Sequence, residues 1–226
     1  MIMRPSLRFS LLAIALTACA ATPTPTPTLA PAPAPTPTPA AAAPAEGQLL
    51  VLDPLRSSVR YAADETFLNE DNRVAVALGQ TSVITGQITL NRAAPAQSAI
   101  GVFAVNLSTL TSDSARRDEA LRTQWLESAR YPVATFVARG LANFPDQPQE
   151  DQPVQFQLLG DLTVKQTTRA VTWDVTATLH NEMIAGQAQT RLRLTEFGVE
   201  PPAIAGILTV KDEVQVTLEF TLLPTQ

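Results

Sequence analysis

Cys19 and His180 are the two side chains of this 226-residue chain best suited to nucleophilic or neutral-pH acid–base chemistry, and each residue type occurs once. A lone cysteine cannot form a disulfide within the chain, and one cysteine with one histidine cannot complete a Cys/His zinc site. A catalytic triad or a Cys-His pair would have to use His180. His180-Asn181 is typical of a turn between strands, where a solvated side chain is expected. We therefore predict that the protein is not an enzyme and holds no metal or other cofactor.

The position of Cys19 indicates lipid attachment. Leu16-Thr17-Ala18 precedes it, and the four residues together resemble the bacterial lipobox, in which a leucine and two small residues precede the cysteine that is acylated. We predict a signal peptide over residues 1–18, cleaved before Cys19, and a lipoprotein anchored to a bacterial membrane outside the cytoplasm. Two acyl chains would hold such a protein firmly on a bilayer.

The residues before the lipobox have the pattern of a signal peptide. Arg4 and Arg8 form a positive segment, and residues 9–16 form an apolar run too short to span a bilayer. The alternative is an ordinary secretory signal that ends at the small-residue site Ala18-Cys19-Ala20-Ala21.

Residues 19–46 differ in composition from the rest of the chain. Within them, residues 22–28 and 30–39 alternate proline with threonine or alanine. Each proline fixes its own φ and disfavours helix at the preceding residue, so extended polyproline II is expected. We predict a tether that reaches at most roughly 80 Å at about 3.1 Å per residue. A proline-motif ligand or a glycosylated stalk are alternatives that rest on composition alone.

Residues 47–226 are predicted to form one domain. The chain carries a net charge of −5 and contains no basic cluster. Binding to nucleic acid requires a cationic surface for the phosphates, so we exclude this class of partner. A segment of this length is long enough to bury a full hydrophobic core.

Period-two alternation dominates this domain and predicts β-strands. In the clearest run, Val214–Leu222, five apolar residues share one face. Seven further β-rich runs are Ser57–Ala62, Ser82–Leu90, Ile100–Leu107, Val133–Ala138, Val154–Leu158, Val171–Val175 and Ala188–Leu194. About eight strands, each with one apolar face, indicate either a closed barrel or two packed sheets.

One segment departs from this pattern. Between Thr111 and Ala129, Ser112 or Asp113 can cap a helix that places Leu121 and Trp125 one turn apart on one face. The sequence thus predicts an all-β barrel or sandwich with one short helical excursion.

Five ordered segments of the domain resemble the YceI family of extracytoplasmic proteins. They are Asp53-Pro54 with Ser57-Ser58-Val59, then Thr85-Gly86-Gln87-Ile88, then Thr111-Ser112-Asp113 through Arg117-Asp118-Glu119-Ala120-Leu121 to Tyr131-Pro132 and Phe136, then Gly160–Lys165 with Thr168–Val171, and finally Phe197-Gly198-Val199 with Asp212-Glu213-Val214. The sequence departs from the family pattern at Ala120, Trp125-Leu126 and Gln166, where a histidine, two phenylalanines and a glycine are usual. The resemblance implies an eight-stranded antiparallel, lipocalin-like barrel whose lumen holds a long polyisoprenoid chain.

The resemblance also implies an apolar tunnel as the binding site, since an isoprenoid tail offers no hydrogen-bonding groups. The residues predicted to line it are Phe103, Val105, Leu121, Trp125, Phe136, Phe156, Leu158, Leu162, Val164 and Trp173. A quinone or pyrophosphate head group would need donors, for which the candidates are Arg117, Arg122, Lys165 and Arg169, with surface ion pairs as the alternative.

The leading hypothesis is therefore a membrane-tethered carrier or reservoir for an isoprenoid lipid, either an isoprenoid quinone or a polyprenyl chain. The alternative is a binding or interaction protein whose barrel is filled by its own side chains and which acts through its surface.

Overall fold

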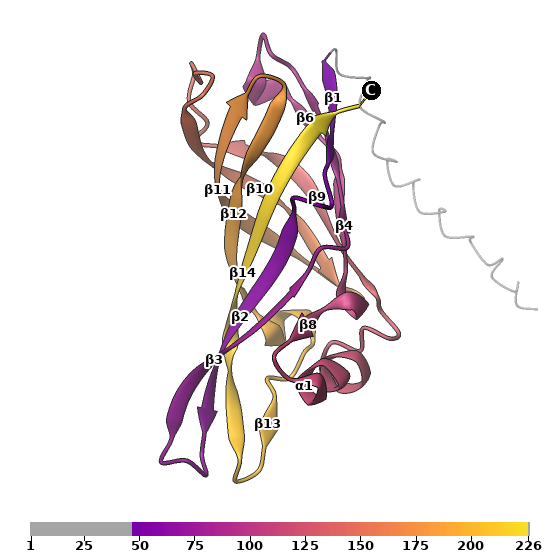
Figure 1. The fold of residues 1–226 in the computed structure, drawn as a ribbon, viewed down its shortest axis with the longest axis vertical. Coiled ribbons are helices and arrows are strands. Elements are labelled where there is room, and N and C mark those ends of the chain that lie inside the picture. Colours follow the sequence, from indigo (N-terminus) through magenta and orange to yellow (C-terminus); the bar gives the residue numbers. More distant parts are fainter. Residues whose placement is uncertain (1–46, 226) are drawn as a thin grey trace, which may run out of the picture. The chain divides into compact units, whose positions relative to one another are not determined.

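Figure 1 shows the computed structural model, which describes residues 47–225. Cys19, the signal peptide and the tether lie outside the described residues. The strands are β1(Gln48–Leu52), β2(Ser58–Phe67), β3(Arg73–Thr81), β4(Ile84–Thr85), β5(Gln87–Leu90), β6(Ala99–Ile100), β7(Val102–Asn106), β8(Thr111–Ser112), β9(Val133–Ala142), β10(Pro153–Val164), β11(Thr167–His180), β12(Met183–Arg193), β13(Ala203–Ile204) and β14(Leu208–Pro224). The helical segments are η1(Pro95–Gln97), η2(Leu107–Thr109), α1(Ala115–Ala120), the π-helical turn η3(Leu121–Trp125) and η4(Leu194–Phe197).

All fourteen strands of the described residues belong to one antiparallel sheet that curls into a half-barrel. Its main path runs β4-β7-β9-β10-β11-β12-β14-β1-β5-β6. Only Gly86 separates β4 from β5. Strand β4 pairs with β7 at one end of the path, and β5 pairs with β1 near the other end, so the two ends of the path come together at Gly86. The all-β class with a short helix is confirmed.

The predicted count of eight strands is wrong, since ten strands lie on the main path alone. The largest omission is β3, where the usual burial pattern is inverted. Val74, Val76 and Leu78 face solvent, whereas small residues such as Ala77 and Gly79 face inward. Alternation of apolar with small residues gives no contrast in hydrophobicity, so the period-two signal disappears. The remaining omissions are mainly two-residue strands, which carry no periodicity.

Strand β14 joins the parts of the sheet. One of its edges pairs with β12, and the other pairs with β2 up to Glu219 and with β1 from Leu222. Between these two partners the buried Thr221 is held by polar contacts: its N–H donates to Ser57 Oγ at 3.0 Å, and its carbonyl accepts from Asp53 N at 2.8 Å. The chain can therefore leave β1 and enter β2 without leaving buried backbone groups unpaired.

The end of the sheet that carries β2, β3 and β13 extends beyond the curled part, and α1 and β8 lie beside it (Figure 1). Helix α1 is capped by Ser114, whose Oγ accepts from Arg117 N at 3.3 Å. The predicted caps, Ser112 and Asp113, are therefore wrong. The Ser112 hydroxyl instead donates to Asp118 at 2.6 Å, and the Asp113 carboxylate pairs with Arg117.

Candidate functional site

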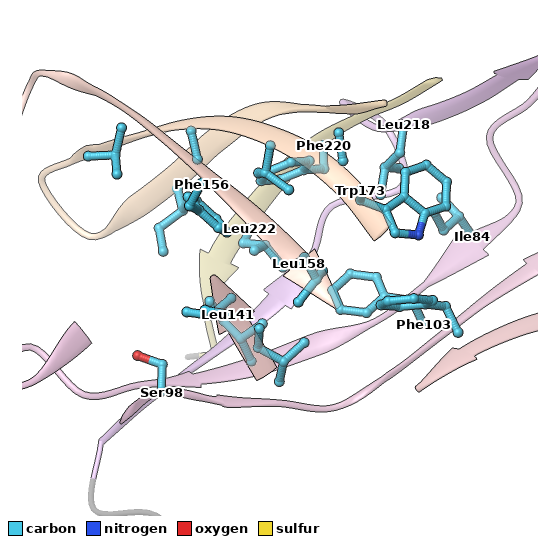
Figure 2. A pocket seen from close by; sticks show the side chains of 18 of the residues that line it. Ile84, Ser98, Phe103, Leu141, Phe156, Leu158, Trp173, Leu218, Phe220 and Leu222 are labelled. Atoms are coloured by element: carbon cyan, nitrogen blue, oxygen red, sulfur yellow. The ribbon is translucent and has the colours of Figure 1, made fainter. Parts of the chain in front are cut away.

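The curled sheet surrounds an apolar cavity of about 470 Å³. Alternate residues of β10, β11 and β14 line it, because successive side chains of a strand point to opposite faces. On β10 these residues run from Val154 to Val164, a span of roughly 33 Å at the rise of an extended strand. Figure 2 shows Leu158, Trp173 and Phe220 among the side chains that converge on this space from different strands.

Glycines provide room for two of the aromatic rings in the wall. A Cβ placed on Gly86 would lie 2.3 Å from the Phe103 ring, and one placed on Gly160 would lie 2.4 Å from the Phe136 ring. Phe136 in turn meets the Trp173 ring edge-on, with centroids 6.1 Å apart. The rings therefore lie against the sheet backbone, and the space between opposite walls is not filled by them.

The two ends of the cavity differ in polarity. Arg92, Ser98, Gln149 and Glu150 line one end, which we call the mouth. Arg92 extends across the mouth, because it donates to the carbonyl of Asn181 at 2.9 Å and lies 4.0 Å from the Glu150 carboxylate.

The opposite end, which we call the base, is apolar. Phe197 from η4 is buried there against the cluster that contains Leu162 and Trp173. The Asp212 carboxylate holds η4 in place by accepting from the backbone and hydroxyl of Thr195, and these hydrogen bonds lower the pKa of Asp212.

The predicted lining residues are distributed unevenly with respect to this cavity. The eight that line it in the structure are Phe103, Val105, Phe136, Phe156, Leu158, Leu162, Val164 and Trp173. Leu121 and Trp125 do not line it, because both belong to η3, which lies outside the curled sheet. Whether any of these residues contacts a ligand stays a prediction.

The prediction missed other lining residues. Leu218, Phe220 and Leu222 lie on the apolar face of the same alternating run that identified the last strand, so this pattern could have revealed them. Arg92 at the mouth had no comparable signal, because its position depends on three loops that are distant in sequence.

None of the four predicted head-group residues lines the cavity. Arg122 pairs with Glu119 at 3.2 Å, and Lys165 pairs with Glu127, which lowers the pKa of that glutamate. Arg169 is exposed and donates to the carbonyl of its neighbour Thr168. Arg122 and Lys165 thus form ion pairs with nearby glutamates, which is the predicted alternative to binding a head group.

Arg117 holds α1 against the inner face of β2. It donates to the buried Glu65 carboxylate at 3.1 Å and also pairs with Asp113. Burial works to lower the pKa of the guanidinium, but these hydrogen bonds outweigh it and raise the pKa. Burial also raises the pKa of the nearby Tyr61 to about 12, so this phenol stays protonated at physiological pH.

His180 lies at the end of β11, is largely exposed and pairs with Asp151. Within residues 47–225, no three His, Cys, Asp or Glu side chains come close enough together to hold a metal ion. In the same part of the chain, no helix is both long and apolar enough to cross a membrane. The absence of catalysis stays a prediction.

The YceI-like domain family matches residues 50–222, which is nearly all of the described chain. The protein belongs to the YceI-like family. No curated protein matches it.

Three solved structures share the fold of this YceI-like protein. BcnA of Burkholderia cenocepacia is 18% identical with a TM-score of 0.59, and the match covers 75% of this chain and 98% of that one. A polyisoprenoid binding domain from Saccharophagus degradans is 13% identical with a TM-score of 0.58, covering 78% and 98%. The Campylobacter jejuni YCEI protein is 12% identical with a TM-score of 0.52, covering 66% and 84%.

The Arg117–Glu65 pair makes a specific prediction for stability. Replacing Arg117 with alanine leaves the buried Glu65 carboxylate without its partner, so we expect R117A to lower the free energy of unfolding by about 3 kcal/mol. Urea denaturation would measure the change. The matched control is R122A, which breaks a more exposed pair and should cost less than about 0.5 kcal/mol. Equal effects of the two substitutions would contradict a structural role for Arg117.

Proposed function

We propose that this YceI-like protein binds a long polyisoprenoid lipid, either an isoprenoid quinone or a polyprenyl chain, in the cavity of its curled sheet. The observation that carries the proposal is an unfilled, apolar cavity of about 470 Å³ that follows the full length of β10. Cavities of this size are typical of small-molecule sites. The polyisoprenoid binding domain from Saccharophagus degradans, which shares the fold, supports the same ligand class.

The physical basis of binding would be the hydrophobic effect. The walls offer aliphatic and aromatic side chains, and each methylene transferred from water into such surroundings contributes about 0.8 kcal/mol. Branched isoprenoid units have no polar atoms that would need partners inside. A long chain therefore gains affinity along its whole length without specific contacts.

The cavity favours this proposal over a surface-acting protein with a filled barrel. A filled barrel of this size would have opposite walls in contact, at the packing density of a protein interior. Here Gly86 and Gly160 leave room for the Phe103 and Phe136 rings close to the backbone, and the volume between the walls stays open.

Lipid exchange would take place at the mouth. Its polar residues come from the loop after β5 and the loop between β9 and β10, and Arg92 connects the two. Anchoring through an acylated Cys19 would keep this opening near a membrane from which a lipid can be taken up or to which it can be delivered. The tether of residues 19–46 would set the distance.

The anchor can be tested separately from the cavity. If Cys19 is acylated, C19S should move the protein from the membrane pellet to the supernatant of fractionated cells and abolish incorporation of labelled palmitate. An unchanged distribution, or labelling that persists in C19S, would contradict the anchor and leave the lipid cavity untouched.

The cavity is tested by filling it. Ala177 lines it on β11, whereas the adjacent Thr176 points to the opposite, exposed face. We expect A177W to weaken binding of a tetraprenyl benzoquinone about tenfold or more, because the indole occupies space that the ligand needs. Native mass spectrometry of the full chain would measure the bound fraction. The control T176W places the same side chain outside and should bind normally. Equal binding by both variants, each with a native circular dichroism spectrum, would contradict the proposed site.

A further inference from the structure

The loop between β9 and β10, residues 143–152, covers one side of the mouth. Phe144 and Pro148 of this loop line the cavity and are half-buried, whereas the three residues between them are exposed. The Phe144 ring meets the ring of Phe156, in the cavity wall, edge-on with centroids 5.1 Å apart. The loop therefore turns an apolar side to the cavity and its other side to solvent.

Both ends of the loop are held by neighbouring strands and have an uncommon backbone conformation. Asn143 donates through its side-chain amide to Gln157 of β10 at 3.2 Å, and Asp151 donates through its N–H to the carbonyl of Leu179 of β11 at 2.8 Å. The φ angle is 57° at Asn143 and 63° at Asp151, in the left-handed region that residues other than glycine seldom adopt. The chain changes direction at these two residues, so they are where a rotation of the loop would be absorbed.

The middle of the loop is held more weakly than its ends. Residues 144–148 form no hydrogen bond with another residue of the described chain, and two of the five are prolines, which have no N–H to donate. Further along, Glu150 lies 4.0 Å from Arg92, and both side chains are about half exposed. Exposed ion pairs of this kind contribute little. The contact of Phe144 with Phe156 is thus the main interaction that keeps the loop against the cavity.

The opposite side of the mouth, residues 91–98, is held by its own hydrogen bonds. The Asn91 side chain accepts from the N–H groups of Ala93 and Ala94 at 3.0 Å each, and the Asn91 N–H donates to Ser98 Oγ at 3.0 Å. This side is a firm rim, so the mouth would open by movement of residues 143–152.

We propose that residues 143–152 form a lid over the mouth, which turns about Asn143 and Asp151 and is closed by the packing of Phe144 on Phe156. Opening of the lid limits the rate at which a lipid enters and leaves the cavity. A change that favours the open lid does so with and without a bound lipid, so it accelerates entry and exit alike. The proposal rests on the proposed function and adds to it the step that controls exchange.

The first test compares two substitutions at one hinge. N143P excludes the φ of 57°, because proline fixes φ near −65°, whereas glycine adopts a positive φ freely. Both substitutions remove the hydrogen bond from the Asn143 side chain, so N143G is the matched control. We expect N143P to raise the entry and exit rates of tetraprenyl-1,4-benzoquinone about tenfold, and N143G to change each by less than about threefold.

Both rates can be measured on the full chain by stopped flow. A quinone that enters the cavity should quench the fluorescence of Trp173, which lines it, and this gives the entry rate. Transfer of the quinone from loaded protein to excess cyclodextrin restores the fluorescence and gives the exit rate. Circular dichroism checks that each variant has the native fold.

The second test removes the contact that closes the lid. F144A should raise both rates about tenfold. The control L141A removes a lining side chain that belongs to β9 and not to the lid, so it should raise the exit rate alone. If F144A raises only the exit rate, or if N143P behaves like N143G, the lid is overturned and the lipid cavity stands. If the wild type takes up no quinone, by fluorescence and by native mass spectrometry, the proposed function itself is overturned.

Discussion

The pairing of one long strand with four others is the constraint on which the rest of this structure depends. Strand β14 keeps β12 on one edge along most of its length and changes partner on the other edge, from β2 to β1. The change is possible because Thr221, which lies between the two partners, has its backbone groups hydrogen-bonded. Its N–H donates to Ser57 Oγ, and its carbonyl accepts from the N–H of Asp53. Strand β1 leads into the curled part of the sheet that surrounds the cavity. Strand β2 leads into the extension, beside which α1 lies.

The cavity follows from this curvature together with the sizes of the inward residues. A curled sheet with large aliphatic side chains at every inward position would be filled. In this chain, Ala134, Ala177 and Ala188 stand among the larger lining residues, and Gly86 and Gly160 allow two rings to lie against the backbone. Phe197 packs against the apolar cluster at the base, whereas Arg92, Ser98, Gln149 and Glu150 line the mouth.

The sequence predicts the fold class because hydrophobic alternation is a local property. Strands with a strong contrast between faces, such as β14, are visible in it, and β3 is not, because Val74 and Val76 face solvent opposite small inward residues. The inward positions of Phe136 and Trp173 follow from the same alternation. The pairing of Arg117 with Glu65 does not, because these residues are distant in sequence and meet only when α1 packs against β2. An unfilled volume leaves no pattern in the sequence, since it depends on the packing of many strands at once.

The most direct measurement of the central claim is native mass spectrometry of the full chain purified from bacterial cells without added lipid, followed by extraction with organic solvent. Acyl chains on Cys19 would remain covalently attached, so extraction separates them from a lipid held in the cavity. We expect a complex with one lipid per protein that releases a polyprenyl species. A protein that carries no such lipid, and that also fails to take up added isoprenoid quinone, would contradict the account.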